Sequence, residues 1–205
     1  MNEQDLILAL QRGDESAFAD LIARHEKKVY NLCLRMLANE HDAEEAAQDA
    51  FLALWRSIGD FRGESSLSTW LYRLASNACI DLMRKNRRAA NDVSIETEEG
   101  TWEIADERAT PHEELERKEQ LRSVREGLDA LPPEYRQVLI LRELQQLSYQ
   151  EIVDVTGLEP GTVKSRISRA RQLLKNYLTA SGNFFESPAS KTGETNAAQG
   201  KEGAK

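Results

Sequence analysis

The segment Leu147–Tyr177 constrains the fold of this chain more than any other. Within it, Ser148 and Glu151 have the S-x-x-E spacing of a capping box, which predicts a short helix over about Tyr149–Thr156. Gly157 follows as a helix stop, and a Pro-Gly pair three residues later lies where a second helix would begin. Two helices joined by about four residues that include glycine form the helix-turn-helix pattern.

The second helix of this pair carries an apolar stripe on one side and cations and hydroxyls on the other. The stripe recurs at helical spacing and consists of Val163, Ile167, Ala170 and Leu174. The opposite side has no carboxylate, and its side chains suit phosphate oxygens and base edges. A surface helix of a small bundle would show the same stripe, but the turn and the missing carboxylates favour DNA binding. The candidate contacts are Lys164, Ser165, Ser168 and Arg169, with Arg166 and Arg171 at the flanks.

Charge is distributed unevenly along the 205 residues, whose formal net charge is −8. Eleven acidic and three basic residues lie between Asp92 and Glu119, so this stretch accounts for the whole net charge. Because the chain from Ala89 to His112 is also poor in large apolar residues, we expect an extended or disordered linker there.

The sequence therefore predicts an all-α fold, with two small helical bundles joined by an acidic flexible linker and the helix-turn-helix in the second bundle. The expected boundaries are a first bundle over residues 1–90, a linker over 91–112, a second bundle over 113–180 and a disordered tail over 181–205.

Composition and motifs argue against several classes of protein. No run of eighteen apolar residues appears, and the N-terminus lacks the basic region of a secretory signal. Cys33 and Cys79 lie within apolar helical patterns without a C-x-x-C motif, so we expect reduced core cysteines in a cytoplasmic protein. Because the sequence shows no catalytic triad, metal cluster, phosphate loop or paired carboxylates, we expect no catalytic residue, metal or cofactor.

A helix is predicted from Asp42 to about Ile58, and a mixed patch lies beside its core-facing side. An aromatic ring and a leucine next to a carboxylate and an amide suit the binding of a partner helix. A wide core face explains the same spacing equally well, so both interpretations remain open. The patch consists of Gln48, Asp49, Leu52 and Trp55.

A loop over residues 59–68 precedes another predicted helix, Thr69–Arg88, whose core stripe includes Trp70 and Leu71. The loop and the outward side of the helix combine aromatics, small hydroxyls, an amide and arginines. These suit a single nucleic-acid strand, because bases can stack or enter a pocket while arginines hold phosphates. A basic amphipathic helix end is the alternative. The candidate residues are Phe61, Arg62, Ser65, Ser66, Tyr72, Arg73, Asn77 and Arg84.

The order of these segments resembles the extracytoplasmic-function (ECF) sigma factors of bacterial RNA polymerase. The resemblance extends from about Leu6 to Leu178. Each motif alone is moderately specific, whereas their order and spacing together are strongly specific. The motifs are DAEEAAQDAFLALWR, FRGESSLSTWLYRLASNACIDLMRK, the acidic linker and LPPEYRQVLILRELQQLSYQEIVDVTGLEPGTVKSRISRARQLLK.

The resemblance implies a subunit that directs core RNA polymerase to specific promoters and helps to melt them. It implies that Asp42–Arg56 docks on the clamp helices of core polymerase, and that Phe61–Thr69 takes a flipped base of the minus-ten element. Asn77 matches an asparagine that recognises or wedges that region. It further implies core polymerase, promoter DNA and an anti-sigma factor as partners, without direct membrane insertion. The positions that match the family's minus-thirty-five contacts are Lys164, Ser165, Ser168 and Arg169.

A stand-alone helix-turn-helix transcriptional regulator is the alternative, with its first bundle used for dimerisation or effector binding. Such a regulator would need neither a second nucleic-acid surface over Tyr72–Arg88 nor a strongly acidic linker. An enzyme with a helical catalytic domain is a third possibility, but the residue sets that catalysis needs are missing. The sequence therefore favours the sigma factor.

Overall fold

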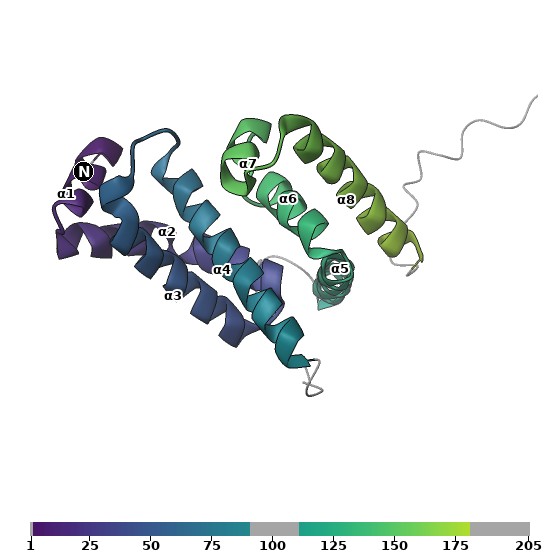
Figure 1. Ribbon diagram of the computed structural model, residues 1–205. Coiled ribbons are helices and arrows are strands. Elements are labelled where there is room, and N and C mark those ends of the chain that lie inside the picture. The colour runs from purple at the N-terminus through teal and green to yellow at the C-terminus, as the bar shows by residue number, and fades with distance from the viewer. Residues whose placement is uncertain (1, 91–110, 181–205) are drawn as a thin grey trace, which may run out of the picture.

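The computed structural model describes residues 2–90 and 111–180, and within these residues it contains helices and no strand (Figure 1). The all-α fold class predicted from the sequence is therefore confirmed. None of the described helices combines the length and the apolar character that a membrane crossing requires. The elements are α1 (Glu3–Gln11), α2 (Glu15–Leu37), α3 (Glu40–Ser57), the 3-10 helix η1 (Ile58–Asp60), α4 (Leu67–Ala90), α5 (Pro111–Asp129), α6 (Pro133–Glu143), α7 (Tyr149–Thr156) and α8 (Pro160–Ala180).

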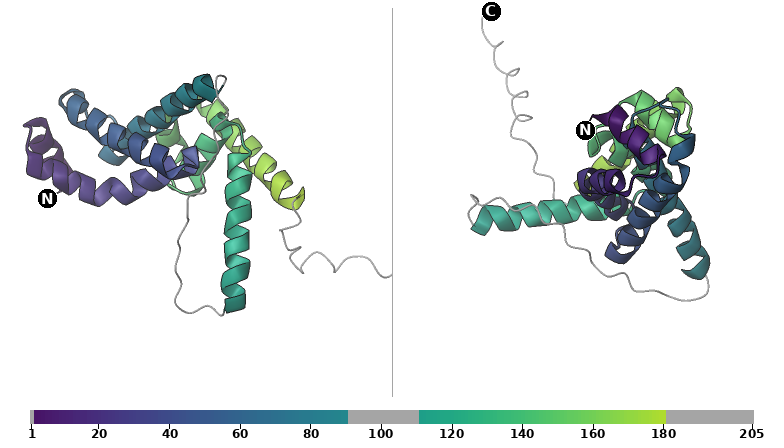
Figure 2. Two further views of the ribbon diagram at one scale, coloured as in Figure 1. Left: turned by 90° about the horizontal axis from the view of Figure 1, so that it is seen from below. Right: turned by 90° about the vertical axis from the view of Figure 1, so that its left-hand side faces the viewer.

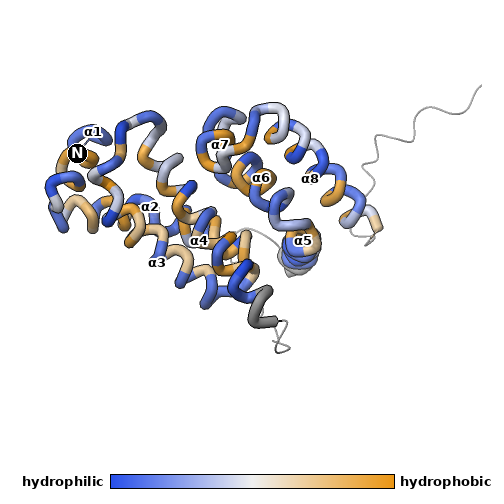
Figure 3. Tube along the Cα trace, in the orientation of Figure 1, coloured by the Kyte–Doolittle hydropathy of each residue, from blue (hydrophilic) through white to orange (hydrophobic). Residues whose placement is uncertain are grey.

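The first bundle consists of α2, α3 and α4, with α1 against α2 and η1 at one end (Figure 1). Its core is formed by leucines at helical spacing, among them Leu21, Leu32 and Leu71, which are fully buried. In Figure 3 hydrophobic and hydrophilic residues alternate along these helices, as amphipathic helices with one buried face require.

The start of α2 shows how local sequence sets a helix boundary. Asp14 is the N-cap residue, and its carboxylate accepts hydrogen bonds from the backbone N–H groups of Ser16 (2.8 Å) and Ala17 (3.2 Å). The Ser16 hydroxyl also donates to this carboxylate, and the three bonds lower the pKa of Asp14. The ionised side chain thus satisfies two of the amides that a helix start leaves unpaired.

Both cysteines belong to the core of the first bundle. Cys33 on α2 and Cys79 on α4 are buried and free, as the sequence predicts. Their side chains are in contact, and the hydrogen bond with Cys33, together with burial, raises the pKa of Cys79. A thiol in such surroundings stays protonated and unreactive.

The helix-turn-helix lies where the sequence predicts it, in α7 and α8. The Ser148 hydroxyl accepts from the Glu151 amide (3.2 Å), while the Glu151 carboxylate accepts from the Ser148 amide (2.8 Å), which completes the capping box. Gly157 ends α7 with φ 68°, a left-handed conformation that strains residues carrying a Cβ. α8 then begins at Pro160. The turn chemistry alone therefore determined these boundaries.

The two bundles are packed against each other. Buried residues of α6, α7 and α8 belong to the same hydrophobic cluster as those of α1 to α4, while a smaller cluster joins α5, α6 and α8. Arg136 of α6 donates to the backbone carbonyl of Met36 at the end of α2 (2.9 Å). The Thr69 side chain of α4 lies close to the carboxylate of Glu151 on α7. The sequence predicts two bundles but gives no indication of this shared core.

Helix α5 extends away from the rest of the molecule (Figure 2). Of its described side chains, the one that joins a hydrophobic core cluster as a buried residue lies at its C-terminal end, where Leu128 packs with Leu139 and Ala170. The acidic linker and the tail predicted from the sequence fall almost entirely on residues 91–110 and 181–205, which lie outside the described residues.

Candidate nucleic-acid interface

Helix α8 presents a polar surface of cations and hydroxyls. Val163, Ile167 and Ala170 are buried, so the predicted apolar stripe faces the core. The opposite side is solvent-exposed at four of the predicted contacts, and Arg166 at its edge is half-buried. Exposed donors on a helix that follows a tight turn are well placed to contact base edges and phosphates. The four exposed residues are Lys164, Ser165, Ser168 and Arg169.

Arg171 has surroundings that the sequence does not predict. Its guanidinium pairs with the carboxylate of Glu143 on α6, through Nη2 (2.6 Å) and Nε (2.9 Å). These hydrogen bonds raise the pKa of Arg171. Arg142 lies over the ring of Tyr149, with its guanidinium carbon 5.1 Å from the ring centroid. Arg171 therefore ties α8 to α6 in addition to flanking the exposed side of α8.

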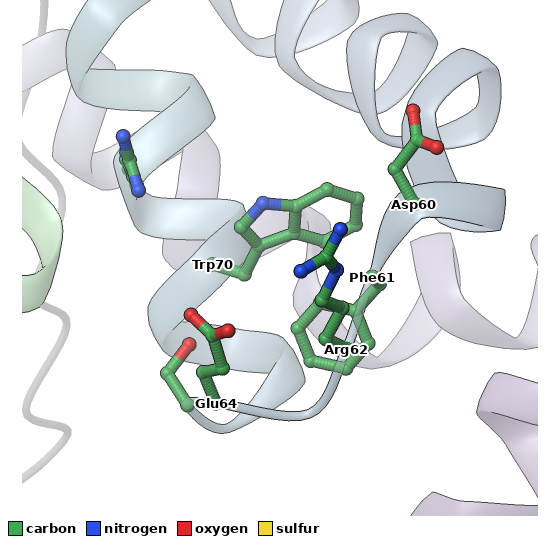
Figure 4. Close-up of a pocket in the computed structure, with 7 residues that line it drawn as sticks. Asp60, Phe61, Arg62, Glu64 and Trp70 are labelled. Carbon is green, nitrogen blue, oxygen red and sulfur yellow. The ribbon is translucent and has the colours of Figure 1, made fainter.

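A cavity of about 310 Å³ lies beside the loop that joins η1 to α4 (Figure 4). The rings of Phe61 and Trp70 form part of its wall, with centroids 4.9 Å apart and planes at 33°. A flat aromatic surface of this kind can stack with an unpaired base. Carboxylates and guanidinium groups on the remaining walls offer hydrogen bonds to its edge. The lining residues are Asp60, Phe61, Arg62, Glu64, Ser65, Trp70 and Arg73.

Four of the eight residues predicted for the single-strand site line this cavity: Phe61, Arg62, Ser65 and Arg73. Three lining residues are absent from the prediction. Trp70 is assigned by its spacing to the core stripe, but its side chain is only half-buried and faces the cavity. Asp60 directly precedes Phe61 and Glu64 directly precedes Ser65, so proximity along the chain was the signal that could have identified them.

The other predicted residues of this site have different surroundings. The Ser66 hydroxyl accepts from the Thr69 amide (3.1 Å) and so caps α4. Asn77 is exposed further along α4 and does not line the cavity. Arg84 is exposed and pairs with Asp81 one turn earlier (3.3 Å). Each of the last two remains available to a strand that follows α4.

The predicted outward position of Tyr72 is wrong. Its side chain is only 5% exposed, and burial raises its pKa. Thr69 and Ser76, one turn before and after it on the same face of α4, are 1% and 0% exposed. This face packs near α7, as the proximity of Thr69 to Glu151 indicates. The packing of the second bundle on the first thus removes Tyr72 from the surface.

The patch on α3 divides into an exposed and a packed part. Gln48 and Asp49 are exposed, and Leu52 keeps 44% of its surface in solvent. Trp55, by contrast, is half-buried and packs on Phe18 of α2, with ring centroids 4.7 Å apart. An apolar groove of about 730 Å³ runs between α2 and α3 beside Leu52. The structure therefore makes Leu52 a surface residue and Trp55 a support of that surface.

The sequence matches two described protein families. Residues 21–89 match Sigma-70 region 2, which includes the cavity and the α3 patch. Residues 121–174 match Sigma-70 region 4, which includes the C-terminal part of α5, all of α6 and α7 and most of α8. All three surfaces described above therefore fall within matched segments.

Known proteins resemble the chain over most of its length. It is 35% identical over 176 residues to the ECF RNA polymerase sigma factor SigW of Bacillus subtilis, covering 84% of this chain and 94% of the relative. It is 37% identical over 180 residues to the ECF RNA polymerase sigma-E factor of Escherichia coli, covering 86% and 94%.

Among solved structures, CnrH in complex with the cytosolic domain of CnrY has a TM-score of 0.65 at 26% identity, over 87% of this chain and 97% of that one. The sigma factor RpoE of Bartonella quintana, in complex with the anti-sigma factor NepR, has a TM-score of 0.64 at 23% identity, over 79% and 96%. The latter likeness concerns the fold.

Proposed function

The chain belongs to the ECF sigma factors of RNA polymerase, and we propose which of its exposed residues bind the polymerase and which bind promoter DNA. As such a factor it is a regulatory DNA-binding protein that directs core polymerase to specific promoters and assists their melting. The stand-alone regulator is not favoured. We propose that the chain has no catalytic activity of its own and acts in the cytoplasm, where it meets polymerase.

We propose that residues 1–90 form a domain for polymerase docking and minus-ten recognition, and that residues 113–180 form a domain for minus-thirty-five recognition. The matched segments 21–89 and 121–174 support this division. Residues 91–112 connect the two domains. We assign no role to residues 181–205.

In the first domain, we propose that the cavity beside Phe61 accepts a base extruded from the minus-ten element. Unstacking a base costs a few kcal/mol, which stacking on an aromatic surface and hydrogen bonds to the base edge offset. Phe61 and Trp70 supply the aromatic surface, while Arg62 and Arg73 supply positive charge. Asn77 and Arg84 lie further along α4, in position to contact the strand beyond the cavity.

In the second domain, we propose that α8 enters the major groove of the minus-thirty-five element. Its exposed side carries two hydroxyls and two cations within six residues, and the capped turn before it fixes its direction. Arg171 is held by Glu143, so we propose that it orients α8 and that Arg169 makes the base-edge contact.

For polymerase docking, we propose the exposed residues Gln48, Asp49 and Leu52 of α3, with Trp55 behind them. The apolar groove beside Leu52 is wide enough for side chains of a partner helix. We also propose an anti-sigma factor as a regulatory partner. In support, the CnrH structure is a complex with the cytosolic domain of CnrY.

The observation that carries these assignments is the aromatic cavity at Phe61 and Trp70, which the chain has in addition to its helix-turn-helix. Transcription in vitro from a candidate promoter, with and without core polymerase, tests the function. We expect promoter-specific, salt-sensitive DNA binding and transcripts only when both proteins are present. Tight, specific operator binding by the chain alone, unchanged by polymerase, would instead support the stand-alone regulator.

A further inference from the structure

Helix α1 makes hydrogen bonds to both ends of the loop that borders the cavity. At the first end, the Gln11 amide donates from Nε2 to the backbone carbonyls of Ile58 (3.3 Å) and Phe61 (3.2 Å). At the other end, the Glu3 carboxylate accepts from the backbone N–H of Leu67 (2.9 Å). A single short helix thus holds the two points between which the loop runs (Figure 1).

The helix that carries these side chains is itself fixed to the bundle. Leu6 and Leu10 on its inner face are buried in the main hydrophobic cluster. Asn2 caps its N-terminus by accepting from the Asp5 amide (2.8 Å). Because the helix is anchored by burial and capped, its polar side chains can define positions in the loop that they contact.

Gln11 acts on Phe61, one of the two aromatic residues in the wall of the cavity. The Phe61 amide donates to the Ile58 carbonyl (3.2 Å), its carbonyl accepts from Gln11, and its ring packs on Trp70. Because backbone and ring are both held, the direction of the ring is set. Without the Gln11 donor, the backbone carbonyls of Ile58 and Phe61 would each lose one hydrogen bond.

Glu3 acts on the start of α4. A helix N-terminus has unpaired amides and a partial positive charge, which an acidic residue in the first turn often complements. α4 has no acidic residue in its first turn. Glu3 supplies that negative charge from a different helix, and it thereby fixes the point from which Trp70 projects into the cavity.

We infer that Gln11 and Glu3 are positioning residues for the minus-ten cavity, and that α1 serves as a brace that keeps the cavity in its base-accepting shape. This inference rests on the proposed role of the cavity. α1 precedes the segment that matches Sigma-70 region 2, which begins at residue 21. The brace therefore acts from outside the segment that matches Sigma-70 region 2.

The test measures binding of single-stranded minus-ten DNA by holoenzyme reconstituted from core polymerase and each variant, with a scrambled strand of equal length beside it. Gln11→Glu keeps the size of the side chain but replaces the donor with a carboxylate that repels the two carbonyl groups. We expect it to weaken binding of the minus-ten strand about five- to thirtyfold. Gln4→Ala, at an exposed position on the same helix, should bind like wild type.

The Glu3 variants give a second, independent measurement. Glu3→Ala removes the acceptor and should weaken strand binding about two- to fivefold, whereas Glu3→Gln keeps an acceptor and should restore most of the affinity. Both affect an exposed side chain, so the fold should tolerate them. Affinity for core polymerase should be the same for all variants.

A double mutant separates a positioning role from a general structural one. If Gln11 acts through Phe61, then Gln11→Glu should add little to the loss caused by Phe61→Ala. Equal strand binding by Gln11→Glu and Gln4→Ala, or full additivity with Phe61→Ala, would overturn the inference. Failure of wild-type holoenzyme to prefer the minus-ten strand over the scrambled strand would instead overturn the proposed role of the cavity, and the inference with it.

Discussion

Arg169 and Arg171 are two residues apart on α8, yet their surroundings assign them different tasks. The Arg171 guanidinium is held by Glu143, so part of its capacity to donate is used inside the protein. Arg169 is exposed on the face that carries Ser165 and Ser168. A guanidinium that remains available on this face can donate two parallel hydrogen bonds to a guanine.

We therefore expect Arg169→Ala to weaken holoenzyme binding to the minus-thirty-five element by about 1–3 kcal/mol and to relax the preference at one or two base pairs. Lys175→Ala should lower affinity for all sequences alike, as loss of a phosphate contact does. Binding measured across a set of single-base promoter variants distinguishes the two outcomes. Equal losses on every sequence from both substitutions would mean that Arg169 does not contact bases.

The ionisation of Glu151 makes the stability contributed by the capping box depend on pH. Hydrogen bonds from the backbone and hydroxyl of Ser148 lower its pKa below the usual 4.5. A lowered pKa means that the folded protein favours the ionised carboxylate. The capping box therefore contributes stability above the ordinary pKa, and this contribution is lost as the pH falls through the folded value.

We expect Glu151→Ala to lower the free energy of unfolding by about 0.5–2 kcal/mol at pH 7, as loss of a cap does. The difference from wild type should shrink as the pH falls from about 5 toward 3, because protonation weakens the cap in the wild type as well. Urea unfolding at several pH values measures both. A difference that stays constant across this range would contradict the role of the ionised side chain.

At the scale of elements, adjacent turns of α3 carry an exposed residue of the proposed docking patch and a packed residue that supports this patch. Leu52 is exposed beside the groove, and Trp55 one turn later packs on Phe18. The sequence leaves open whether this patch is a partner surface or a wide core face. The structure places one residue in each environment, because the Trp55 ring packs on Phe18 of α2 whereas Leu52 borders an open groove.

Leu52→Ala should accordingly weaken binding to core polymerase by roughly 1–4 kcal/mol while the unfolding free energy stays near that of wild type. Trp55→Ala should reduce stability by about 1–3 kcal/mol, less than for a fully buried tryptophan, because the ring is half-exposed. Polymerase binding and chemical unfolding, measured on both variants, give the comparison. Loss of stability in Leu52→Ala without loss of docking would make Leu52 a core residue.

At the scale of the whole molecule, the shared core places both DNA-binding surfaces in one compact body. The minus-ten and minus-thirty-five elements are named for positions about 25 base pairs apart, which is roughly 80 Å of duplex at 3.4 Å per base pair. A compact chain of this length has a radius of gyration of only about 16 Å. The packed arrangement is too short for the two proposed surfaces to reach both elements together, so we expect the bundles to separate on the promoter.

We expect fluorophores at Glu44 and Asn176, exposed positions on α3 and α8, to show high energy transfer in the isolated chain. Transfer should fall when core polymerase and promoter DNA are added, because the contacts of Arg136 with Met36 and of Thr69 with Glu151 break. Labels at Glu44 and Gln4, both in the first bundle, should be unaffected. Unchanged transfer between the first pair of labels would show that the bundles stay together.

The sequence by itself determined the features that depend on residues three or four positions apart. The capping box, the Gly157 stop and the apolar stripe of α8 follow from local geometry, and the resemblance to ECF sigma factors rests on such segments taken in order. The position of the cations on α8 and the loop at Phe61 could also be predicted from the sequence, because both appear as polar residues between or beside regularly spaced apolar ones.

Only the tertiary structure decided which of these faces meet solvent. Tyr72 is buried because α7 packs near α4, and Trp70 faces a cavity because the loop turns beside it. Glu3 reaches Leu67 from 64 residues away. A helical period shows which residues share a face of a helix. It does not show which other segment covers that face, because this depends on the packing of segments distant in sequence.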